Sequence, residues 1–253
     1  MKIGICGGPD RLLGAGKMGY DYVELPASGV TALTEDEFEQ VLKLREETGV
    51  PTPAFNVLFP GTIDLMGATP DGEIAGYLEK CMSRLERLGG DTVVFGSGRS
   101  RNRPDGMSYA DAFRRLVQVT RMIGDAAAAH GITAVIEPLN RTETNMINSV
   151  AEAACLQAAA EHPNVKVLAD YYHVALDGEP FEDIVRVGGV SHVHIAAAGS
   201  RAYPAECEPG FIRFFDALRK SGYDGRVSLE GKTEDPDRDA PAALKVLRSL
   251  AER

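Results

Sequence analysis

The sequence contains no tryptophan, and aromatic residues make up only 7% of its 253 residues. No apolar run approaches the roughly 18 to 20 residues that a membrane-spanning helix needs, so we expect no membrane partner. Positive charge is also scarce, since 27 Lys and Arg face 37 Asp and Glu and the formal net charge is -10. Such a field repels nucleic acid and anionic surfaces, so no nucleic-acid partner is expected either.

Cysteine is sparse and is not arranged for a disulfide framework or a thiolate metal site. Cys6, Cys81, Cys155 and Cys207 are far apart, with no CxxC pair, and the opening MKIGICGG is not a basic and apolar leader. This usage favours a reduced, cytoplasmic setting. The 44% hydrophobic and 25% charged residues are ordinary for a globular protein, and the length suits one domain, residues 1–253.

Short apolar or β-branched runs alternate with longer amphipathic stretches along the whole chain. The runs expected to form strands are 2–6, 21–26, 52–59, 92–98, 133–139, 165–170, 191–196 and 226–231. Eight strand-helix units in about 250 residues predict an α/β fold, a single (β/α)8 TIM barrel, because a doubly wound sheet more often has about five to seven strands.

The stretches between these runs have the pattern of amphipathic helices. In 34–49, Thr34 followed by Glu37 predicts a capping box, and Gly49 predicts the end of the helix. The other expected helices are 75–90, 109–131, 149–163, 211–225 and 240–253. The second half of each unit is therefore expected to cover the outside of the barrel.

Polar residues close several of the apolar runs, and in such a barrel the active site lies at the carboxyl ends of the strands. These residues are Glu24, Asn56, Glu137, Asp170, His194 and Glu230. Alternation along the strands points Glu137 and Glu230 into the barrel interior. For Glu24 and Asn56 two interpretations stay open, a place in the pocket lining or hydrogen bonds within the barrel mouth.

Inward carboxylates from neighbouring strands repel one another unless they share a cation. We therefore expect Glu137, Asp170, His194 and Glu230 to hold one divalent metal ion. Three carboxylates and one imidazole favour manganese, with magnesium, cobalt or zinc as alternatives. His192 also faces inward, but one layer deeper, so it is not expected to be a ligand.

The run GSGRSRNRPDG after the fourth strand is rich in arginine and glycine. Arg99, Arg101 and Arg103 are interpreted as members of a solvated, salt-bridged loop in preference to a site for an anionic substrate. Gly96 and Gly98 are expected to let this loop turn close to the pocket.

The sequence resembles the xylose-isomerase-like superfamily of sugar isomerases and epimerases over essentially its whole length. The most specific segment is IEPLNRTETN, residues 136–145, which is similar to the fifth-strand motif of ketose 3-epimerases. In those enzymes the first Glu is both metal ligand and catalytic base, and a second Glu six residues later contacts the substrate. The resemblance therefore implies these roles for Glu137 and Glu143.

Three other segments extend the resemblance. LADYYH, residues 168–173, is similar to the sixth-strand motif and implies Asp170 as a metal ligand and His173 as a substrate contact. SLEG, residues 228–231, implies Glu230 as a ligand and the second catalytic carboxylate. The segment HIAAAGSRAYPAECE looks closer to hydroxypyruvate isomerase and implies a substrate contact for Arg201.

One departure bears on the substrate. The ketose 3-epimerases have a Gly-Glu pair soon after the seventh-strand ligand and place aromatic side chains, including tryptophan, against the sugar. This chain has alanines at 196–198 and no tryptophan. We therefore expect a small or polar-ended substrate in preference to an unmodified ketohexose.

The resemblance implies a metal-dependent isomerase or epimerase that acts on a small-molecule sugar or hydroxy-ketone through a cis-enediolate, with Glu137 and Glu230 as acid and base. It also implies a homo-oligomer, either a dimer or a tetramer. The alternatives are a lyase with the same enediolate chemistry on a keto-sugar conjugate and a sugar-binding homologue without turnover. An apurinic endonuclease of the same barrel group is disfavoured, because that branch needs more metal-binding histidines and a basic face, whereas this chain has five histidines and a net charge of -10.

Overall fold

The computed structural model describes residues 1–253, which form one closed barrel of eight parallel strands. Each strand pairs with the next along the chain, and β8 returns to pair with β1. The strands are β1 (Lys2–Cys6), β2 (Tyr22–Pro26), β3 (Ala54–Asn56), β4 (Thr92–Phe95), β5 (Thr133–Ile136), β6 (Val165–Asp170), β7 (His192–Ile195) and β8 (Arg226–Leu229). The predicted TIM barrel is confirmed.

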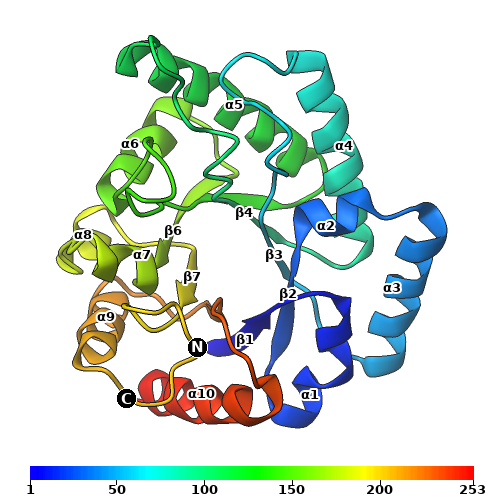
Figure 1. Ribbon diagram of the computed structural model, residues 1–253, viewed down its shortest axis with the longest axis vertical. Coiled ribbons are helices and arrows are strands. Elements are labelled where there is room, and N and C mark those ends of the chain that lie inside the picture. The colour runs from blue at the N-terminus through cyan, green and yellow to red at the C-terminus, as the bar shows by residue number, and fades with distance from the viewer.

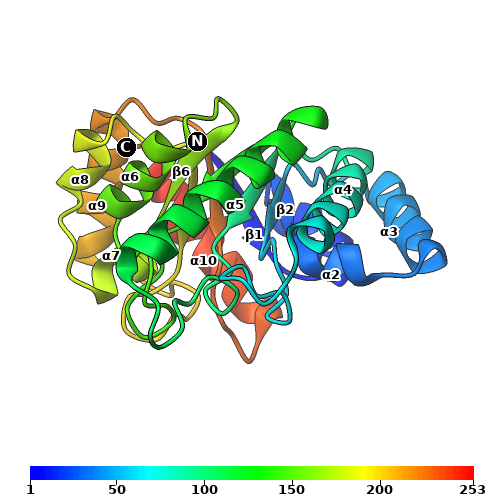
Figure 2. The same cartoon turned by 90° about the horizontal axis from the view of Figure 1, so that it is seen from above.

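Helices surround the barrel as an outer layer (Figure 1). They are η1 (Pro9–Leu13), α1 (Ala15–Met18), α2 (Ala27–Ala32), α3 (Glu35–Thr48), α4 (Asp71–Arg87), α5 (Tyr109–Ala129), α6 (Val150–Ala160), α7 (Tyr171–Leu176), α8 (Glu182–Arg186), α9 (Pro209–Lys220) and α10 (Pro236–Ala251). None of them is long and apolar enough to cross a membrane. The loops that follow the strands gather on one side of the molecule, at the lower edge of Figure 2.

Helix ends follow the signals in the sequence, with some differences at the first turns. Thr34 and Glu37 form the predicted capping box of α3, and Gly49 ends that helix with φ 65°. Helix α4 begins at Asp71, four residues before the expected start, because Asp71 and Glu73 suit the positive end of the helix dipole. Helix α10 begins at Pro236, which needs no N–H partner in a first turn.

Several strands are shorter than the apolar runs that predicted them. The run 52–59 contributes only Ala54–Asn56 to the ladder, because the chain turns at Val57, where φ is 49°. Likewise β5 ends at Ile136 and β8 ends at Leu229. Glu137 and Glu230 therefore lie one residue beyond their strands, where they face the barrel mouth.

The apolar residues form two separate groups because strand neighbours alternate between the barrel interior and the helix layer. A cluster of 60 buried residues fills the space between strands and helices. Inside the barrel, only Val94, Val135 and Leu168 form an apolar cluster. The opposite side of the interior is polar, and there the ring of Tyr22 occupies the space that a side chain at Gly4 would need. The interior core thus has one apolar wall and one hydrogen-bonded wall.

Candidate active site

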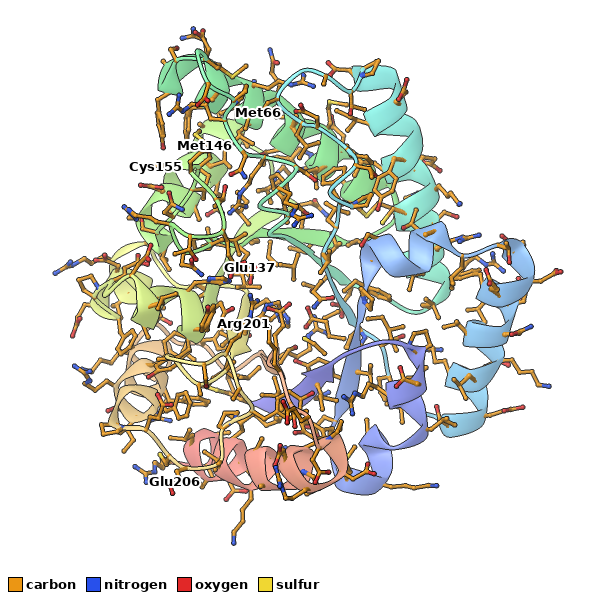
Figure 3. The ribbon with its side chains drawn as sticks, viewed as in Figure 1. Met66, Glu137, Met146, Cys155, Arg201 and Glu206 are labelled. Atoms are coloured by element: carbon orange, nitrogen blue, oxygen red, sulfur yellow. The ribbon has the colours of Figure 1, made fainter.

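Four acidic or imidazole side chains from the successive strands β5 to β8 converge at the barrel mouth. The ligand atoms of Glu137, Asp170, His194 and Glu230 all lie within 4.8 Å of one another. Asp170 and His194 are fully buried, and Glu137 is 5% exposed. Figure 3 shows Glu137 near the centre of the ring of strands. The structure therefore brings together the whole set of expected metal ligands.

The polar atoms of this cluster face one another with too few donors between them. Nδ1 of His194 lies 3.1 Å from Oε1 of Glu137 and 3.6 Å from Oε2 of Glu230. Oδ1 of Asp170 accepts a hydrogen bond from the backbone N–H of Tyr172 at 2.9 Å, but its buried Oδ2 accepts none. An orphaned carboxylate oxygen beside two other carboxylates needs a cation. The donor set suits a divalent metal ion.

The electrostatics of the cluster point the same way. Burial, together with the charges of Glu137 and Glu230, raises the pKa of Asp170 to about 8. Burial also raises the pKa of Glu137. At Glu230, burial favours the protonated form, but His194 and Arg201 outweigh it and lower the pKa to about 2. The pKa values of these three neighbouring carboxyl groups are thus shifted in different directions, as happens where like charges share one small volume.

Arg201 lies beside this cluster and joins two of the expected site residues. Its guanidinium donates to Oε2 of Glu230 at 2.7 Å and to Oε1 of Glu143 at 3.0 Å. The guanidinium carbon also lies 4.9 Å from the centre of the Tyr172 ring. Figure 3 shows Arg201 close to the centre of the ring, near Glu137. The loop after β7 therefore brings its arginine beside the cluster of expected metal ligands.

The backbone at Arg201 is held in an unusual conformation. Its φ is 54°, a left-handed value that is uncommon for a residue with a side chain. Two hydrogen bonds fix the turn, one from Arg201 N–H to the carbonyl of Ala197 at 2.9 Å and one from Lys232 N–H to the carbonyl of Arg201 at 2.7 Å. The loops after β7 and β8 thus support each other and aim the guanidinium at the mouth.

His173 also reaches the site, and its surroundings define its protonation. Nδ1 accepts from the backbone N–H of Asn140 at 3.1 Å and from the side-chain amide of Asn140 at 2.8 Å. The proton of the neutral ring is therefore on Nε2, which lies 3.5 Å from Oδ2 of Asp170 and has no hydrogen-bond partner. Burial and the charge of Arg201 lower the pKa of His173 to about 3. His173 offers the site a neutral N–H donor.

The two open interpretations for Glu24 and Asn56 have different outcomes. Glu24 is fully buried below the cluster, where it hydrogen bonds to His192 and His194. Asn56 donates to Oε1 of Glu230 at 2.7 Å, and its carbonyl oxygen has no partner. Asn56 therefore lies at the barrel mouth in contact with Glu230, and Glu24 belongs to the layer beneath it.

The interpretation of the arginine-rich loop is wrong for Arg101. This side chain is 0% exposed, and it donates to the carbonyl oxygens of Phe95 at 3.0 Å, Glu137 at 2.8 Å and Ile147 at 3.3 Å. It thereby joins the end of β4 to two points of the loop that follows β5. Arg101 is thus an internal support of the backbone at Glu137, which no local sequence pattern indicates.

The glycines of the same loop leave room for the side chains of Glu137 and Leu139. A side chain at Gly96 would overlap Oε2 of Glu137, and a Cβ at Gly98 would lie 2.9 Å from Leu139. The expectation that this loop turns close to the pocket is therefore correct. No sequence pattern marks Cys6 as a site residue, yet it closes β1 and its sulfur joins Glu24 and His194 in a second group with all ligand atoms within 4.8 Å.

Known proteins are similar to this chain in sequence and in fold. Residues 14–250 match the family model described as xylose isomerase-like TIM barrel. The 3-dehydro-D-guloside 4-epimerase of Escherichia coli is 26% identical over 245 residues, which are 92% of this chain and 91% of that protein. The D-psicose 3-epimerase of Agrobacterium fabrum is 26% identical over 222 residues, 85% of this chain and 75% of that protein.

Solved structures agree on the architecture. A D-allulose 3-epimerase from Methylomonas sp., in complex with D-allulose, superposes with a TM-score of 0.86 and 20% identity, covering 99% of this chain and 97% of that one. At this identity the likeness shows the fold alone, whereas the family match extends over nearly all of the sequence. The chain belongs to the xylose isomerase-like TIM barrel family, and its relatives include sugar epimerases and isomerases.

Proposed function

We propose that this chain is a divalent-metal-dependent isomerase or epimerase of a sugar or hydroxy-ketone, with Glu137 and Glu230 as its acid and base. The observation that carries the proposal is the meeting of these two carboxylates around one imidazole nitrogen. Glu137 follows β5 and Glu230 follows β8, the strands on either side of the pair β6–β7. Both carboxylates lie within 3.6 Å of Nδ1 of His194. Two carboxylates around one small space are what proton removal and return at a carbon atom require.

The residues that would hold the metal are Glu137, Asp170, His194 and Glu230. Three carboxylates and one imidazole favour manganese, with magnesium, cobalt and zinc as the alternatives. When bound, such a cation polarises a substrate carbonyl and the neighbouring hydroxyl, which acidifies the C–H bond between them.

The chemistry assigned to the chain is a transfer of one proton in each direction. One glutamate removes the proton from the carbon beside the carbonyl, and the electron pair of the C–H bond moves into a cis-enediolate. The other glutamate returns a proton. Return to the opposite face of the same carbon gives an epimer, and return to the former carbonyl carbon moves the carbonyl along the chain.

The neutral side chain of His173 and the cation Arg201 are assigned to the substrate's oxygen atoms. His173 holds its unpartnered Nε2–H at the edge of the cluster, where it suits a hydroxyl or carbonyl oxygen. Glu143 is held in place by Asn140 and Arg201 and offers an acceptor to a hydroxyl group. These contacts orient the substrate and leave the proton transfers to the two glutamates.

The charges around Arg201 narrow the substrate class. Its fork already binds two carboxylates, Glu143 and Glu230, so a substrate carboxylate at this place would meet two anions beside one cation. The site therefore favours uncharged hydroxyl groups next to the reacting carbons. The similarity to epimerases named for keto-sugar substrates supports the same choice.

A lyase that uses the same enediolate on a keto-sugar conjugate remains the alternative among enzymes. It shares the first proton transfer and differs in the second, because a leaving group on the next carbon departs before a proton returns. A sugar-binding homologue without turnover would show neither step. The three functions are therefore separated by product analysis on one set of substrates.

The test is proton NMR of candidate substrates incubated with the protein and Mn²⁺ in deuterium oxide. The panel contains tetruloses, pentuloses, hexuloses, keto-glycosides and hydroxypyruvate. We expect deuterium to replace hydrogen at the carbon beside the carbonyl of an uncharged substrate, with an epimer or isomer as product. No exchange with any compound would contradict the proposal, and elimination without an isomer would favour the lyase.

Variants make the test specific to the residues. Arg201→Ala is expected to weaken turnover of every substrate, because Glu143 and Glu230 lose the cation between them. Glu206→Gln is the matched control, since Glu206 is exposed on the same loop and lies toward the outside of the molecule in Figure 3. An Arg201→Ala variant with the activity of wild type would contradict the assigned contact.

A further inference from the structure

We propose that Glu24 is a positioning residue for the metal site, which holds His194 so that Nδ1, and not Nε2, is its metal-binding atom. The inference rests on the proposed function only in that it takes the cluster of four side chains to be a metal site. It concerns a residue on β2, which is distant in sequence from the ligands at the ends of β5 to β8.

Both oxygens of Glu24 are fully used inside the barrel. Oε1 lies 2.8 Å from Nε2 of His194, and Oε2 lies 2.8 Å from Nε2 of His192. Oε2 also accepts a hydrogen bond from the hydroxyl of Ser228, whose oxygen lies 2.7 Å from the hydroxyl of Tyr22. All five side chains are at most 1% exposed, so no water competes for these bonds.

The direction of each hydrogen bond follows from the carboxylate. Each oxygen of Glu24 lies 2.8 Å from a ring nitrogen, and Oε2 also faces the hydroxyl of Ser228, so the carboxylate accepts from groups that can all donate. Ser228 must then donate to Glu24, and Tyr22 must donate to Ser228. For the same reason, both histidines carry a proton on the nitrogen that faces Glu24, which is Nε2 in each case.

This assignment fixes the free lone pair of His194. With its Nε2 proton directed at Glu24, the neutral ring presents Nδ1 to the opposite side. That atom faces Glu137 at 3.1 Å and Glu230 at 3.6 Å and belongs to the four-residue ligand group. A proton or a metal ion on Nδ1 relieves the repulsion between this nitrogen and the carboxylate oxygens. Because Glu24 keeps Nε2 protonated, a metal ion that takes the place of the Nδ1 proton would bind Nδ1.

His192 is one of the groups that hold the carboxylate of Glu24 in place. Nδ1 of His192 is buried without a partner, so Glu24 is the one strong polar contact that orients this ring. The two imidazole rings pack edge to face, with centroids 5.2 Å apart and an interplanar angle of 80°. His192, Ser228 and the packed ring of His194 thus hold the carboxylate from three sides. The deeper histidine of the HVH motif acts on the metal through Glu24.

The first experiment reads the binding atom in the unmodified protein. Histidine is labelled with ¹⁵N, the protein is loaded with ¹¹³Cd²⁺, and the nitrogen–cadmium couplings are recorded. We expect one coupled histidine nitrogen, Nδ1 of His194, whose Nε2 shows the shift of a protonated nitrogen. His192 should show no coupling, and a His192→Gln sample assigns its signals. Coupling through Nε2 of His194 would overturn the inference.

The second experiment measures metal affinity by titration with Mn²⁺, followed by the electron paramagnetic resonance signal of the free ion. Glu24→Gln is expected to bind Mn²⁺ about 10- to 100-fold more weakly, because its amide can accept from only one histidine and carries no charge. Tyr22→Phe is the matched control. It removes a buried hydroxyl of the same network but leaves Glu24 in contact with both histidines, so its affinity should remain within about threefold of wild type.

The outcomes separate this inference from the proposed function. A Glu24→Gln variant that is folded and binds Mn²⁺ as tightly as wild type would show that Glu24 only fills the core. If that variant does not fold, the cadmium coupling in the unmodified protein still decides the question. Metal bound through Nδ1 without substrate exchange would contradict the proposed function and leave this inference standing. A wild-type protein that binds no divalent ion would overturn both.

Discussion

The polar groups at the two ends of the barrel differ in how they are paired. At the amino ends of the strands, ion pairs tie the chain together. Arg226 binds Asp91 at 2.9 Å, Arg248 binds Asp21 at 2.9 Å, and the amino terminus binds Asp224 at 2.9 Å. At the carboxyl ends, buried atoms of Asn56, Asp170 and His173 have no hydrogen-bond partner.

The backbone shows the same contrast. Five residues other than glycine have positive φ, and four of them lie in loops that follow strands at the carboxyl end: Val57, Ser97, Ile147 and Arg201. The fifth, Glu161, ends helix α6 on the outside. Unsatisfied groups and strained backbone both reduce stability, so their concentration at one end marks the end where side chains are arranged for chemistry.

The largest expected effect is on proton transfer at the carboxyl end. Glu137→Gln and Glu230→Gln are each expected to reduce substrate deuterium exchange by about 100- to 10,000-fold, since glutamine has an oxygen ligand but cannot accept a proton. Proton NMR in deuterium oxide measures the exchange, and circular dichroism checks that the barrel is folded. Exchange near the wild-type rate in both variants would leave these residues as ligands only and place the base elsewhere.

A second expected effect is a gain in thermal stability together with a loss of metal binding. Asp170→Asn removes one of three crowded carboxylates, so the metal-free variant is expected to melt at a higher temperature than metal-free wild type. Mn²⁺ should raise the melting temperature of wild type and have little effect on the variant, because only the wild type binds it tightly. A variant that melts lower without metal would show that the carboxylate cluster is not a strained arrangement.

An Asp170→Ala, His194→Ala double variant should lose metal in elemental analysis.

A smaller effect is expected at the amino end. Arg226→Met removes the pair with Asp91, which is 56% exposed, and the hydrogen bond to Thr92. The free energy of unfolding should fall by about 1 kcal/mol, as for other half-exposed pairs, while Mn²⁺ affinity is unchanged. Urea unfolding and metal titration measure the two quantities. Loss of metal affinity in this variant would show that the two ends are coupled.

The smallest effect tests a half-buried carboxylate outside the site. Burial and the nearby charges of Asp183 and Glu152 raise the pKa of Glu179 to about 7, although its Oε1 accepts from Val150 N–H at 2.7 Å. A raised pKa stabilises the fold below about pH 4.5, and this stability is lost as pH rises through 7. The free energy of unfolding of Glu179→Gln should therefore rise relative to that of wild type between pH 5 and 8. The increase should be about 1 kcal/mol or less after solvent screening. Parallel urea titrations measure the difference, and a constant difference across this range would contradict the expectation.

The sequence predicted those features that depend on neighbours along the chain. Strand alternation and the polar residues that close each run were enough to place Glu137, Asp170, His194 and Glu230 together, because closure of the barrel brings all strand ends to one mouth. The resemblance added Arg201, which the structure places beside Glu230. The capping box of α3 is a local signal of the same kind.

Contacts across the barrel had no such signal. Glu24 meets His192 and His194 across 168 and 170 residues of sequence, and this pairing depends on which strands lie opposite after closure. The burial of Arg101 depends on how two loops fold over it. Helix α7 begins directly after β6 with no turn between them, since Asp170 both ends the strand and caps the helix. One residue with two structural roles cannot be recognised from the pattern of either element.

The space around Glu137 also determines how this enzyme can be altered in the laboratory. Because any side chain at Gly96 would overlap Oε2 of Glu137, a substitution there displaces the carboxylate that we propose for proton transfer before it can touch a new substrate. Libraries that seek other substrates should therefore leave Gly96 unchanged. Variation belongs at Asn56 and Cys6, which close β3 and β1 at the same mouth, with Asn56 in contact with Glu230 and Cys6 in the polar group of Glu24 and His194.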